Sequence, residues 1–368
     1  MVSFETMAEK DYWILWNQLY EHVGPVRFNQ LLKAFGSAKG GWETPAEAFT
    51  KLGWDEKALQ ALEKRGKLAI APISEQISKL KAKVITTADP EYPESLRSIY
   101  DPPPLLYVRG ELLSSDNLSL AVVGTRKMTR YGQEVVEALI PELTAVGLTI
   151  ISGLALGIDA AAHKAALEAG GRTVAVLACG IDQIYPPANT KLGEEIIRRG
   201  RGAIITEFPP GTSTYPSNFP VRNRIISGMA LGTLVVEAAE GSGTFHTVRA
   251  ALEQGREVFA VPGSIFSPYS AGTAKLIASG AKPVTSGKDI LEELEVEVKA
   301  KMQEVKEAMP TTKREEELLA LLGNDEKHVD EIIKIANMAT NEILSTLTLL
   351  EMKGLVKSLG SGLYRKAA

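Results

Sequence analysis

Short apolar runs alternate with amphipathic helical patterns from Leu118 to Thr285 of this 368-residue chain. The runs are rich in valine, isoleucine and alanine, as in SLAVVG (119–124), LTIISG (148–153) and TLVVEA (233–238). Such runs are typical of strands that are buried on both faces of a parallel sheet. The alternation therefore predicts an α/β fold, an extended Rossmann-like, doubly wound parallel sheet with helices on both faces.

The segments before this region predict a helical domain and an edge of the sheet. Residues 1–79 predict a helical SAM-like or helix-hairpin-helix domain. Its short helices are expected from residue 11 to about residue 68, with a tight turn at Gly24–Pro25 and a helix over 25–35. Hairpin amides can bind a phosphate backbone. No basic cluster lies beside this turn, which favours a bundle that binds nothing. Residues 80–110 predict two strands joined by a proline-rich crossing. We expect this segment to join the sheet as an edge, and we therefore set the bounds of the sheet domain at 80–297.

The segments after the sheet domain predict a linker and a winged helix. Residues 298–313 are charged and weakly apolar, as a linker would be. Residues 314–368 predict three helices and a hairpin that turns at 360–362. The third helix of a winged helix usually reads DNA. Here it carries Glu342 and Glu351, with Lys353 near its end, which favours a protein-contacting or accessory role.

Composition narrows the classes of function. The chain is 45% hydrophobic and 23% charged, as in ordinary globular proteins, and no apolar run approaches membrane-spanning length. The first residues lack a signal-peptide pattern, and the single Cys179 excludes an internal disulfide, so we expect a cytoplasmic protein. Four histidines without paired spacing predict no metal site. The net charge of −4 requires any nucleic-acid site to be local.

Four glycine-rich loops follow predicted strands, at 124–132, 152–163, 208–228 and 240–247. The carboxyl ends of parallel strands meet at one edge of a sheet, where ligands bind at a topological switch point. Glycines let the backbone approach an anion, and helix N-termini supply N–H donors. The loops predict a phosphate-bearing ligand, although the chain has neither a G-x-G-x-x-G nor a Walker A sequence.

The loop over 208–228 is unusual because of its arginines. If Pro220 is the first helical residue, Arg222 and Arg224 lie in the first turn, where the helix dipole disfavours cations. A bound phosphate would explain both arginines, and so would internal ion pairs with Glu207 or Glu237. Tyr215 and Phe219 place aromatic rings beside these cations, as single-stranded nucleic-acid sites do, although loop packing explains each ring equally well.

A catalytic interpretation has little support in the sequence. Asp159 and His163 are four residues apart and share a helix face, so they could form an acid–base pair. A helix-terminal aspartate and a packed histidine explain them better. Ser152 lies in no G-x-S-x-G motif, and His246 opens a predicted helix where it could meet a phosphate.

The motifs closely resemble those of the DNA-processing protein A (DprA/Smf) family. The matching strings are YPESLRSIYDPPPLLYVRG, AVVGTRKMTRYG, SGLALGIDAAAH, VLACGIDQIYPPAN, TEFPPGT, FPVRNRIISG, VVEAAEGSGT and VFAVPG. The resemblance covers most of 90–285. It implies a Rossmann-like domain that binds single-stranded DNA and helps to load the RecA recombinase in natural transformation. It also implies a homodimer through that domain and no established catalytic activity. We expect no cofactor.

The resemblance assigns roles to particular residues. Arg126, Arg222, Asn223 and Arg224 would hold the DNA backbone, and Phe219 would stack on a base. Backbone amides and hydroxyls would line the rest of the pocket. The expected DNA-binding set is Gly124, Thr125, Arg126, Ser152, Gly153, Asn218, Phe219, Arg222, Asn223, Arg224, Ser242, Gly243 and Thr244. Many members of the family carry a basic residue where this chain has Val221, so affinity could be lower unless Arg224 compensates.

Two other functions remain open from the sequence. One is a Rossmann-type nucleotide-processing enzyme, such as a nucleoside-monophosphate phosphoribohydrolase, because EGSGT is similar to that class's phosphate loop. It would need a catalytic glutamate, for which Glu237 and Glu240 are candidates. The other is a structural adaptor whose partners are proteins.

Overall fold

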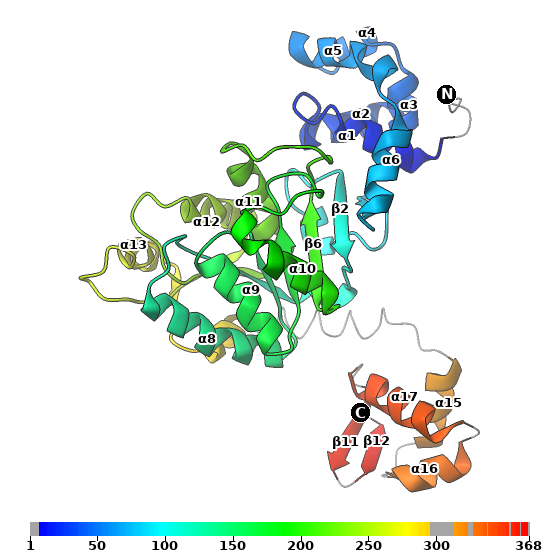
Figure 1. The fold of residues 1–368 in the computed structure, drawn as a ribbon, viewed down its shortest axis with the longest axis vertical. Helices are drawn as coiled ribbons and strands as arrows, with labels where there is room; N and C mark the ends of the chain where they lie inside the picture. Colours follow the sequence, from blue (N-terminus) through cyan, green and yellow to red (C-terminus); the bar gives the residue numbers. More distant parts are fainter. Residues whose placement is uncertain are drawn as a thin grey trace. The chain divides into compact units, whose positions relative to one another are not determined.

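The computed structural model describes residues 7–294, 313–322, 327–336, 338–352, 355–360 and 362–366. The chain divides into two compact units, residues 1–298 and 299–368 (Figure 1). The linker expected at 298–313 lies outside the described residues, apart from Lys313.

A nine-stranded sheet forms the centre of the first unit, in the order β1-β2-β6-β5-β4-β3-β7-β8-β9. Neighbouring strands from β6 to β9 pair in parallel, whereas β2 pairs antiparallel with both β1 and β6. The predicted parallel sheet and its edge over 80–110 are therefore confirmed. The strands are β1 (Lys83–Thr86), β2 (Leu105–Gly110), β3 (Ser119–Val123), β4 (Thr149–Ser152), β5 (Thr173–Val176), β6 (Gly202–Thr206), β7 (Gly232–Val235), β8 (Glu257–Ala260) and β9 (Lys282–Pro283).

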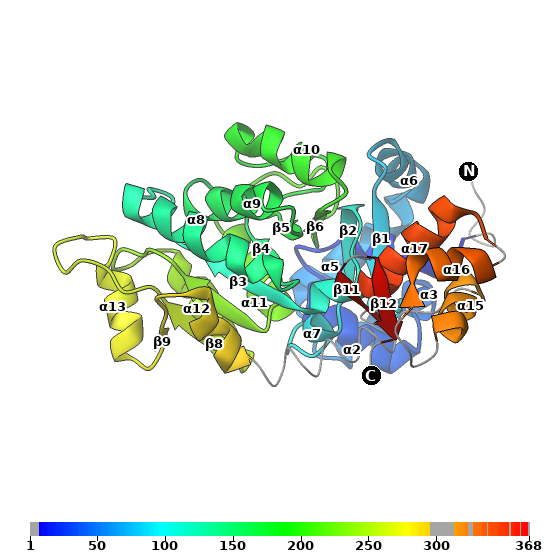
Figure 2. The ribbon, with the colours of Figure 1, turned by 90° about the horizontal axis from the view of Figure 1, so that it is seen from below.

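Helices cover both faces of this sheet (Figure 2). Leu120 and Val122 of β3 pack with α8 and α9, whereas Ala121 and Val123 point to the face that α11 and α12 cover. This alternation confirms the doubly wound prediction. One face carries α8 (Arg130–Ala145), α9 (Ile158–Glu168) and α10 (Thr190–Arg198), and the other carries α7 (Glu94–Arg97), α11 (Asn218–Met229), α12 (Thr244–Glu253) and α13 (Ala271–Ala278).

The chain reverses its direction across the sheet at β3. From β3 it passes to β4, β5 and β6 in turn, and then returns to β7 on the other side of β3. Ligands of doubly wound proteins bind beside such a switch, outside the carboxyl ends of the strands. The four glycine-rich loops all leave the sheet at this edge, because each follows the end of β3, β4, β6 or β7.

The N-terminal helices form a tryptophan-rich bundle. Trp16 stacks edge-on against Trp42 at 5.1 Å between ring centroids, and its indole N–H donates to the carbonyl of Ala38 at 3.0 Å. All four tryptophans of the chain lie in this bundle. The helix expected over 25–35 is present, whereas α6 was not anticipated. The helices are α1 (Glu9–Asn17), α2 (Pro25–Phe35), α3 (Ala38–Glu43), α4 (Glu47–Thr50), α5 (Glu56–Glu63) and α6 (Ile70–Lys79), with the 3-10 turn η2 (Arg65–Lys67).

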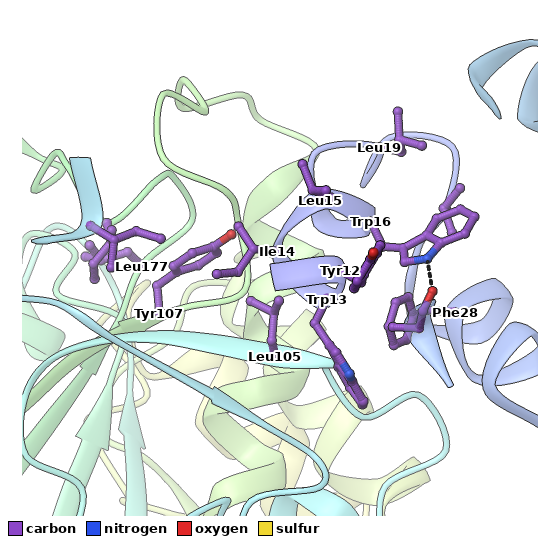
Figure 3. Close-up of a cluster of buried hydrophobic side chains, with 14 of the residues drawn as sticks. Tyr12, Trp13, Ile14, Leu15, Trp16, Leu19, Phe28, Leu105, Tyr107 and Leu177 are labelled. Atoms are coloured by element: carbon purple, nitrogen blue, oxygen red, sulfur yellow. Dashed lines mark hydrogen bonds between the residues drawn. The ribbon is translucent and has the colours of Figure 1, made fainter. Parts of the chain in front are cut away.

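Helix α1 joins the bundle to the sheet edge. Ile14 points toward Tyr107 of β2 and Leu177, and all three belong to one buried cluster (Figure 3). The Tyr107 hydroxyl donates to Asn17 Oδ1 at 3.0 Å, and Asn17 Nδ2 donates to the Glu207 carbonyl at 3.1 Å. The helical bundle thus shares its core with the sheet, and both lie in the same compact unit.

The second unit has the winged-helix layout that the sequence predicted. Its core contains Leu318, Ile332 and Leu347, one from each helix. A short strand, β10, was not anticipated; it pairs with β12 to give the order β10-β12-β11. The elements are α15 (Lys313–Leu322), β10 (Lys327–His328), α16 (Val329–Ile335), α17 (Thr340–Met352), β11 (Val356–Gly360) and β12 (Leu363–Lys366). Lys353, noted after the third helix, lies outside the described residues.

Within the part of the chain that the structure describes, no helix has the length and apolar character that a membrane span requires. The same residues contain no cluster of three histidine, cysteine, aspartate or glutamate side chains that could hold a metal ion.

Candidate nucleic-acid interface

Arg222 of α11 lies across the carboxyl ends of two strands. Its Nη1 donates to the carbonyl of Gly153 at 2.9 Å and to that of Val176, the last residue of β5. Its Nε donates to Asn223 Oδ1 at 3.1 Å. The side chain is only 3% exposed, so its positive charge is fixed at the sheet edge by carbonyl dipoles rather than by solvent.

Asp159 of α9 supplies a buried counter-charge to Arg222. Its Oδ2 accepts the N–H of Gly153 at 3.0 Å and that of Ala155 at 3.4 Å. Burial raises the pKa of Asp159, and the charge of Arg222 opposes this rise. Burial lowers the pKa of Arg222 to about 10, and Asp159 opposes this fall. Arg222 therefore remains a cation at neutral pH.

Only glycine fits at position 153, between these two charges. A Cβ atom there would lie 2.7 Å from Nη2 of Arg222 and 2.8 Å from Oδ2 of Asp159. Such distances are shorter than van der Waals contact, so the glycine allows the buried pair to approach the backbone of the 152–163 loop.

Phe219, one turn before Arg222 on α11, contacts two guanidinium groups. The ring centroid lies 4.9 Å from Cζ of Arg126 and 5.9 Å from Cζ of Arg222, within the range of cation–π attraction. Tyr185 lies beside the same ring at 6.1 Å between centroids. These side chains line one small pocket, whose residues are Arg126, Gly153, Ala155, Leu156, Ala178, Tyr185, Pro186, Phe219 and Arg222.

Arg126 is the exposed cation of this pocket. It comes after Gly124 and Thr125 in the loop that follows β3, and it forms no ion pair with a carboxylate in the described residues. Arg130, in the same 124–132 loop, is also exposed, but its Nε pairs with Glu134 Oε1 at 2.9 Å. Arg130 does not line the pocket. Arg126 is thus available to an incoming anion.

The first two glycine-rich loops are held against each other. The N–H of Ile158 donates to the carbonyl of Thr125 at 3.2 Å, and Gly157 has a φ of 79°. Leu154 has a φ of 55°, which is rare for a bulky residue, and its carbonyl accepts Asn189 Nδ2 at 2.8 Å. Backbone strain of this kind is stored where the surrounding structure fixes a binding site.

Glu237 holds the arginine-bearing loop rather than facing a substrate. Its Oε2 accepts the N–H of Thr129 at 2.9 Å, and its Oε1 accepts the Thr129 hydroxyl at 2.6 Å. Glu237 is also 2% exposed. Glu240 is exposed, and Lys275 Nζ lies 3.5 Å from its Oε1. Neither glutamate lines the pocket of Arg126, Phe219 and Arg222.

The structure brings only part of the expected set together. Arg126, Gly153, Phe219 and Arg222 line the pocket. Asn218 lies beside it, because its Nδ2 donates to the carbonyl of Ala178 at 3.1 Å. The remaining members of the expected set do not line the pocket: Gly124, Thr125, Ser152, Asn223, Arg224, Ser242, Gly243 and Thr244.

Two serine assignments differ from expectation. Ser152 is fully buried, and its hydroxyl donates to the carbonyl of Val122 at 2.7 Å, so it joins β4 to β3 instead of lining the pocket. Ser242 lies before α12, where its Oγ is 2.9 Å from Oγ1 of Thr244. This fourth loop therefore forms a separate helix start at the same sheet edge.

The position predicted for the arginines in α11 was wrong. The helix begins at Asn218 rather than at Pro220, so Arg222 and Arg224 lie in its second turn. Arg224 is buried, and it pairs with Glu207 through Nη2 and with Asp101 through Nε at 3.2 Å. The internal ion pair explains Arg224. Its guanidinium does not reach the pocket and cannot compensate there for the exposed, apolar Val221.

The paired carboxylate and imidazole of α9 have structural roles. His163 is fully buried, with Nδ1 2.6 Å from Oγ1 of Thr173, and burial lowers its pKa to about 3. Asp159 faces Arg222 instead. His246 is exposed in the first turn of α12 and does not line the pocket.

Sequence reasoning missed Tyr185, Pro186 and Leu156 as pocket residues. Tyr185 could have been found, because it is an aromatic residue in a proline-rich loop after β5, at the same sheet edge as the arginines. Leu156 and Pro186 carry no chemical signal in the sequence.

A doubly wound sheet whose carboxyl edge carries an aromatic ring within cation–π distance of two arginines defines a Rossmann-like protein with a cationic, aromatic edge. The chain belongs to the DNA-processing protein A (DprA/Smf) family. Residues 83–295 match the family described as DNA recombination-mediator protein A, and residues 303–362 match the DprA winged helix domain. The chain is thus a DNA-processing, recombination-mediator type of protein.

Curated relatives and solved structures agree with this family. The chain is 46% identical over 211 residues to DNA processing protein DprA of Bacillus subtilis, covering 57% of this chain and 70% of the relative. It is 40% identical over 285 residues to Protein Smf of Escherichia coli, covering 76% of each. The structure of DNA processing protein A from Streptococcus pneumoniae superposes with a TM-score of 0.68 at 35% identity, covering 78% of this chain and 98% of that one.

The structure of a second relative is described together with single-stranded DNA. DNA processing protein A from Helicobacter pylori superposes with a TM-score of 0.53 at 27% identity, covering 59% of this chain and 97% of that one. Its title describes a single-stranded DNA binding mode of that protein.

Proposed function

We propose that this chain binds single-stranded DNA at the pocket of Arg126, Phe219 and Arg222. The observation that carries the proposal is the Phe219 ring, with guanidinium groups 4.9 Å and 5.9 Å away, at the carboxyl edge beside the switch at β3. A base that stacks on the ring places its flanking phosphates beside two cations. The relative from Helicobacter pylori, whose title names single-stranded DNA, supports this choice of ligand.

The arginines of the pocket take different roles in this proposal. Arg126 is exposed and can contact a phosphate directly. Arg222 is buried and bound to carbonyls, so it orients Phe219 and adds positive charge beneath the ring. Tyr185 offers a second aromatic surface beside the ring, 42% exposed.

We further propose that the bound strand is passed to the RecA recombinase, with protection of incoming DNA in natural transformation or recombination. The family resemblance supports this role, together with a homodimer through the Rossmann-like domain, a cytoplasmic location and a non-enzymatic mode of action. The β8–α13 loop supports the dimer, since Ile265 and Phe266 are each 90% exposed. Adjacent exposed apolar side chains are typical of surfaces that a partner covers.

Binding of a fluorescent oligo-dT across salt concentrations tests the proposed site. Phe219→Ala should weaken binding about tenfold, because stacking on an aromatic ring is worth roughly 1–3 kcal/mol per base. Arg126→Ala should reduce the slope of log affinity against log salt by about 0.7, the value for one phosphate contact on a single strand. Arg130→Ala removes an exposed arginine of the same loop and serves as the matched control.

Equal affinity of wild type, Phe219→Ala and Arg126→Ala for oligo-dT would refute the site. Absence of wild-type binding at low salt would refute the function and favour a protein-binding adaptor. Product formation from AMP would instead favour the nucleotide-processing enzyme.

A further inference from the structure

A second, larger hollow lies between the N-terminal bundle and the loop that precedes α11. We call it the bundle groove; its walls are residues 18–22, Lys64 and Leu68 on one side and residues of the 208–218 loop on the other. Its cavity volume is about 630 Å³, against about 60 Å³ for the Phe219 pocket. Sites that enclose small organic ligands measure about 300–1,000 Å³, so the groove has room for more than one nucleotide component.

The groove adjoins the Phe219 pocket. Asn218 lines the groove, Phe219 follows it in the chain, and Asn218 Nδ2 donates at 3.1 Å to the carbonyl of Ala178, which lines the pocket. The pocket and the groove are therefore neighbours at residues 218 and 219.

The groove carries aromatic rings at two depths. Phe208 and Tyr20 form its floor, with ring centroids 5.0 Å apart and Phe208 fully packed. Tyr215 stands on the rim, 56% exposed, and presents a ring to solvent. The exposed ring of Tyr215 suits stacking of unpaired bases, which depends little on sequence.

The bundle side of the groove supplies positive charge. Lys64 lines the groove, is exposed, and forms no ion pair with a carboxylate in the described residues. Lys67 follows in the same basic corner, next to Arg65, whose Nη1 is held by the carbonyls of Gly41, Trp42 and Thr44. Glu21 is the one carboxylate in the groove lining and His22 its one imidazole, so Lys64 balances the charge of Glu21 within the lining.

We propose that the groove is a second subsite for single-stranded DNA, in which Tyr215 stacks on a base and Lys64 contacts a phosphate. The strand would run from the Phe219 pocket along the 208–218 loop and onto the N-terminal bundle. This inference rests on the proposed function and extends it, because it assigns the bundle a direct contact with the strand.

Oligonucleotide length separates the two subsites. Full-length protein is titrated with fluorescent dT5 and dT20, and unfolding curves of each variant confirm the fold. Tyr215→Ala should weaken dT20 binding about tenfold and leave dT5 within about twofold of wild type. Lys64→Glu should weaken dT20 and reduce its salt slope by at least about 0.7. Lys33→Glu makes the same charge change on an exposed bundle residue that does not line the groove, and it should change neither.

The outcomes distinguish the groove from the pocket. If both groove variants bind dT20 as tightly as wild type while Phe219→Ala weakens the binding of dT5 and dT20, the groove is not a DNA subsite. The proposed function then stands. Unchanged affinity of Phe219→Ala for both oligonucleotides would count against the proposed site at the Phe219 pocket, and absence of wild-type binding to either would refute the proposed function itself.

Crosslinking provides an independent measurement. A dT20 strand with 4-thiothymidine at each position is irradiated in the complex, and the crosslinked tryptic peptides are identified. We expect peptides from residues 9–79 as well as from the 208–228 loop. Crosslinks to the sheet loops without any to the bundle would overturn the groove.

Discussion

The buried ion pair of Arg224 and Glu207 fixes the helix that carries Phe219. Glu207 is fully buried, and Arg224, two residues after Arg222, is 8% exposed. Burial raises the pKa of Glu207, and the charge of Arg224 opposes this rise. Removing one partner of a buried pair costs about 3–5 kcal/mol, because the other charge is left uncompensated. In Glu207→Gln, Asp101 still lies 3.2 Å from Arg224 Nε, so we expect the lower end, about 3 kcal/mol.

Paired substitutions make this prediction specific. Replacing both members of a buried pair is often nearly neutral, so Glu207→Gln with Arg224→Met should be more stable than Glu207→Gln alone. The measurement is urea unfolding at pH 7, followed by circular dichroism at 222 nm. A Glu207→Gln protein within about 0.5 kcal/mol of wild type would refute the reasoning, and so would strictly additive losses in the double variant.

The same double variant tests whether Arg224 contacts DNA. Because Arg224 is held inside the protein, the salt slope of oligo-dT binding should not change in the double variant. A slope reduced by about 0.7 would restore the phosphate-binding role that the sequence predicted for it.

Further predictions concern the pocket, the core and the dimer. Gly153→Ala forces a methyl group against Arg222, and should lower both stability, by about 1–3 kcal/mol, and oligo-dT affinity; urea unfolding and titration measure these. The pKa of His163 is about 3 in the folded state and near 6.5 in the unfolded state. The stability that depends on the neutral imidazole is therefore complete above pH 6.5 and is lost as pH falls toward 3. The urea concentration at the unfolding midpoint should therefore fall less steeply between pH 7 and pH 4.5 in His163→Gln than in wild type. Equal dependence of the midpoint on pH in the two proteins would contradict this. Phe266→Ser should shift the mass measured by light scattering toward the monomer, whereas an unchanged mass would place the dimer contact elsewhere.

The sheet could be predicted because local and global signals agree in it. The strands around Leu120 and Ile150 are apolar on both faces, and the helices between them are amphipathic, so the order of elements followed directly. The edge position of 80–110 followed from its prolines. Helix α6 and strand β10 were missed, because their patterns are short and their positions depend on tertiary contacts.

The site could be predicted by location more easily than by residue role. Glycine-rich loops at strand ends located the pocket, but nothing in the local sequence distinguishes Arg222 from Arg224. Both lie on one helix, and their roles differ because Arg224 meets Glu207 whereas Arg222 meets backbone carbonyls. Such partners come from segments distant in the chain, and pairing across the fold is not visible in a single sequence.

The confinement of all four tryptophans to the N-terminal bundle gives the protein a built-in optical probe. Indole emission reports the surroundings of Trp16 and the other three tryptophans. It does not report on the sheet region, which contains no tryptophan. Separation of the bundle from β2 would therefore change the tryptophan emission, whereas the far-ultraviolet circular dichroism would stay constant as long as the sheet region keeps its fold. Intrinsic fluorescence can therefore follow the N-terminal bundle in unlabelled protein, without any dye on the DNA.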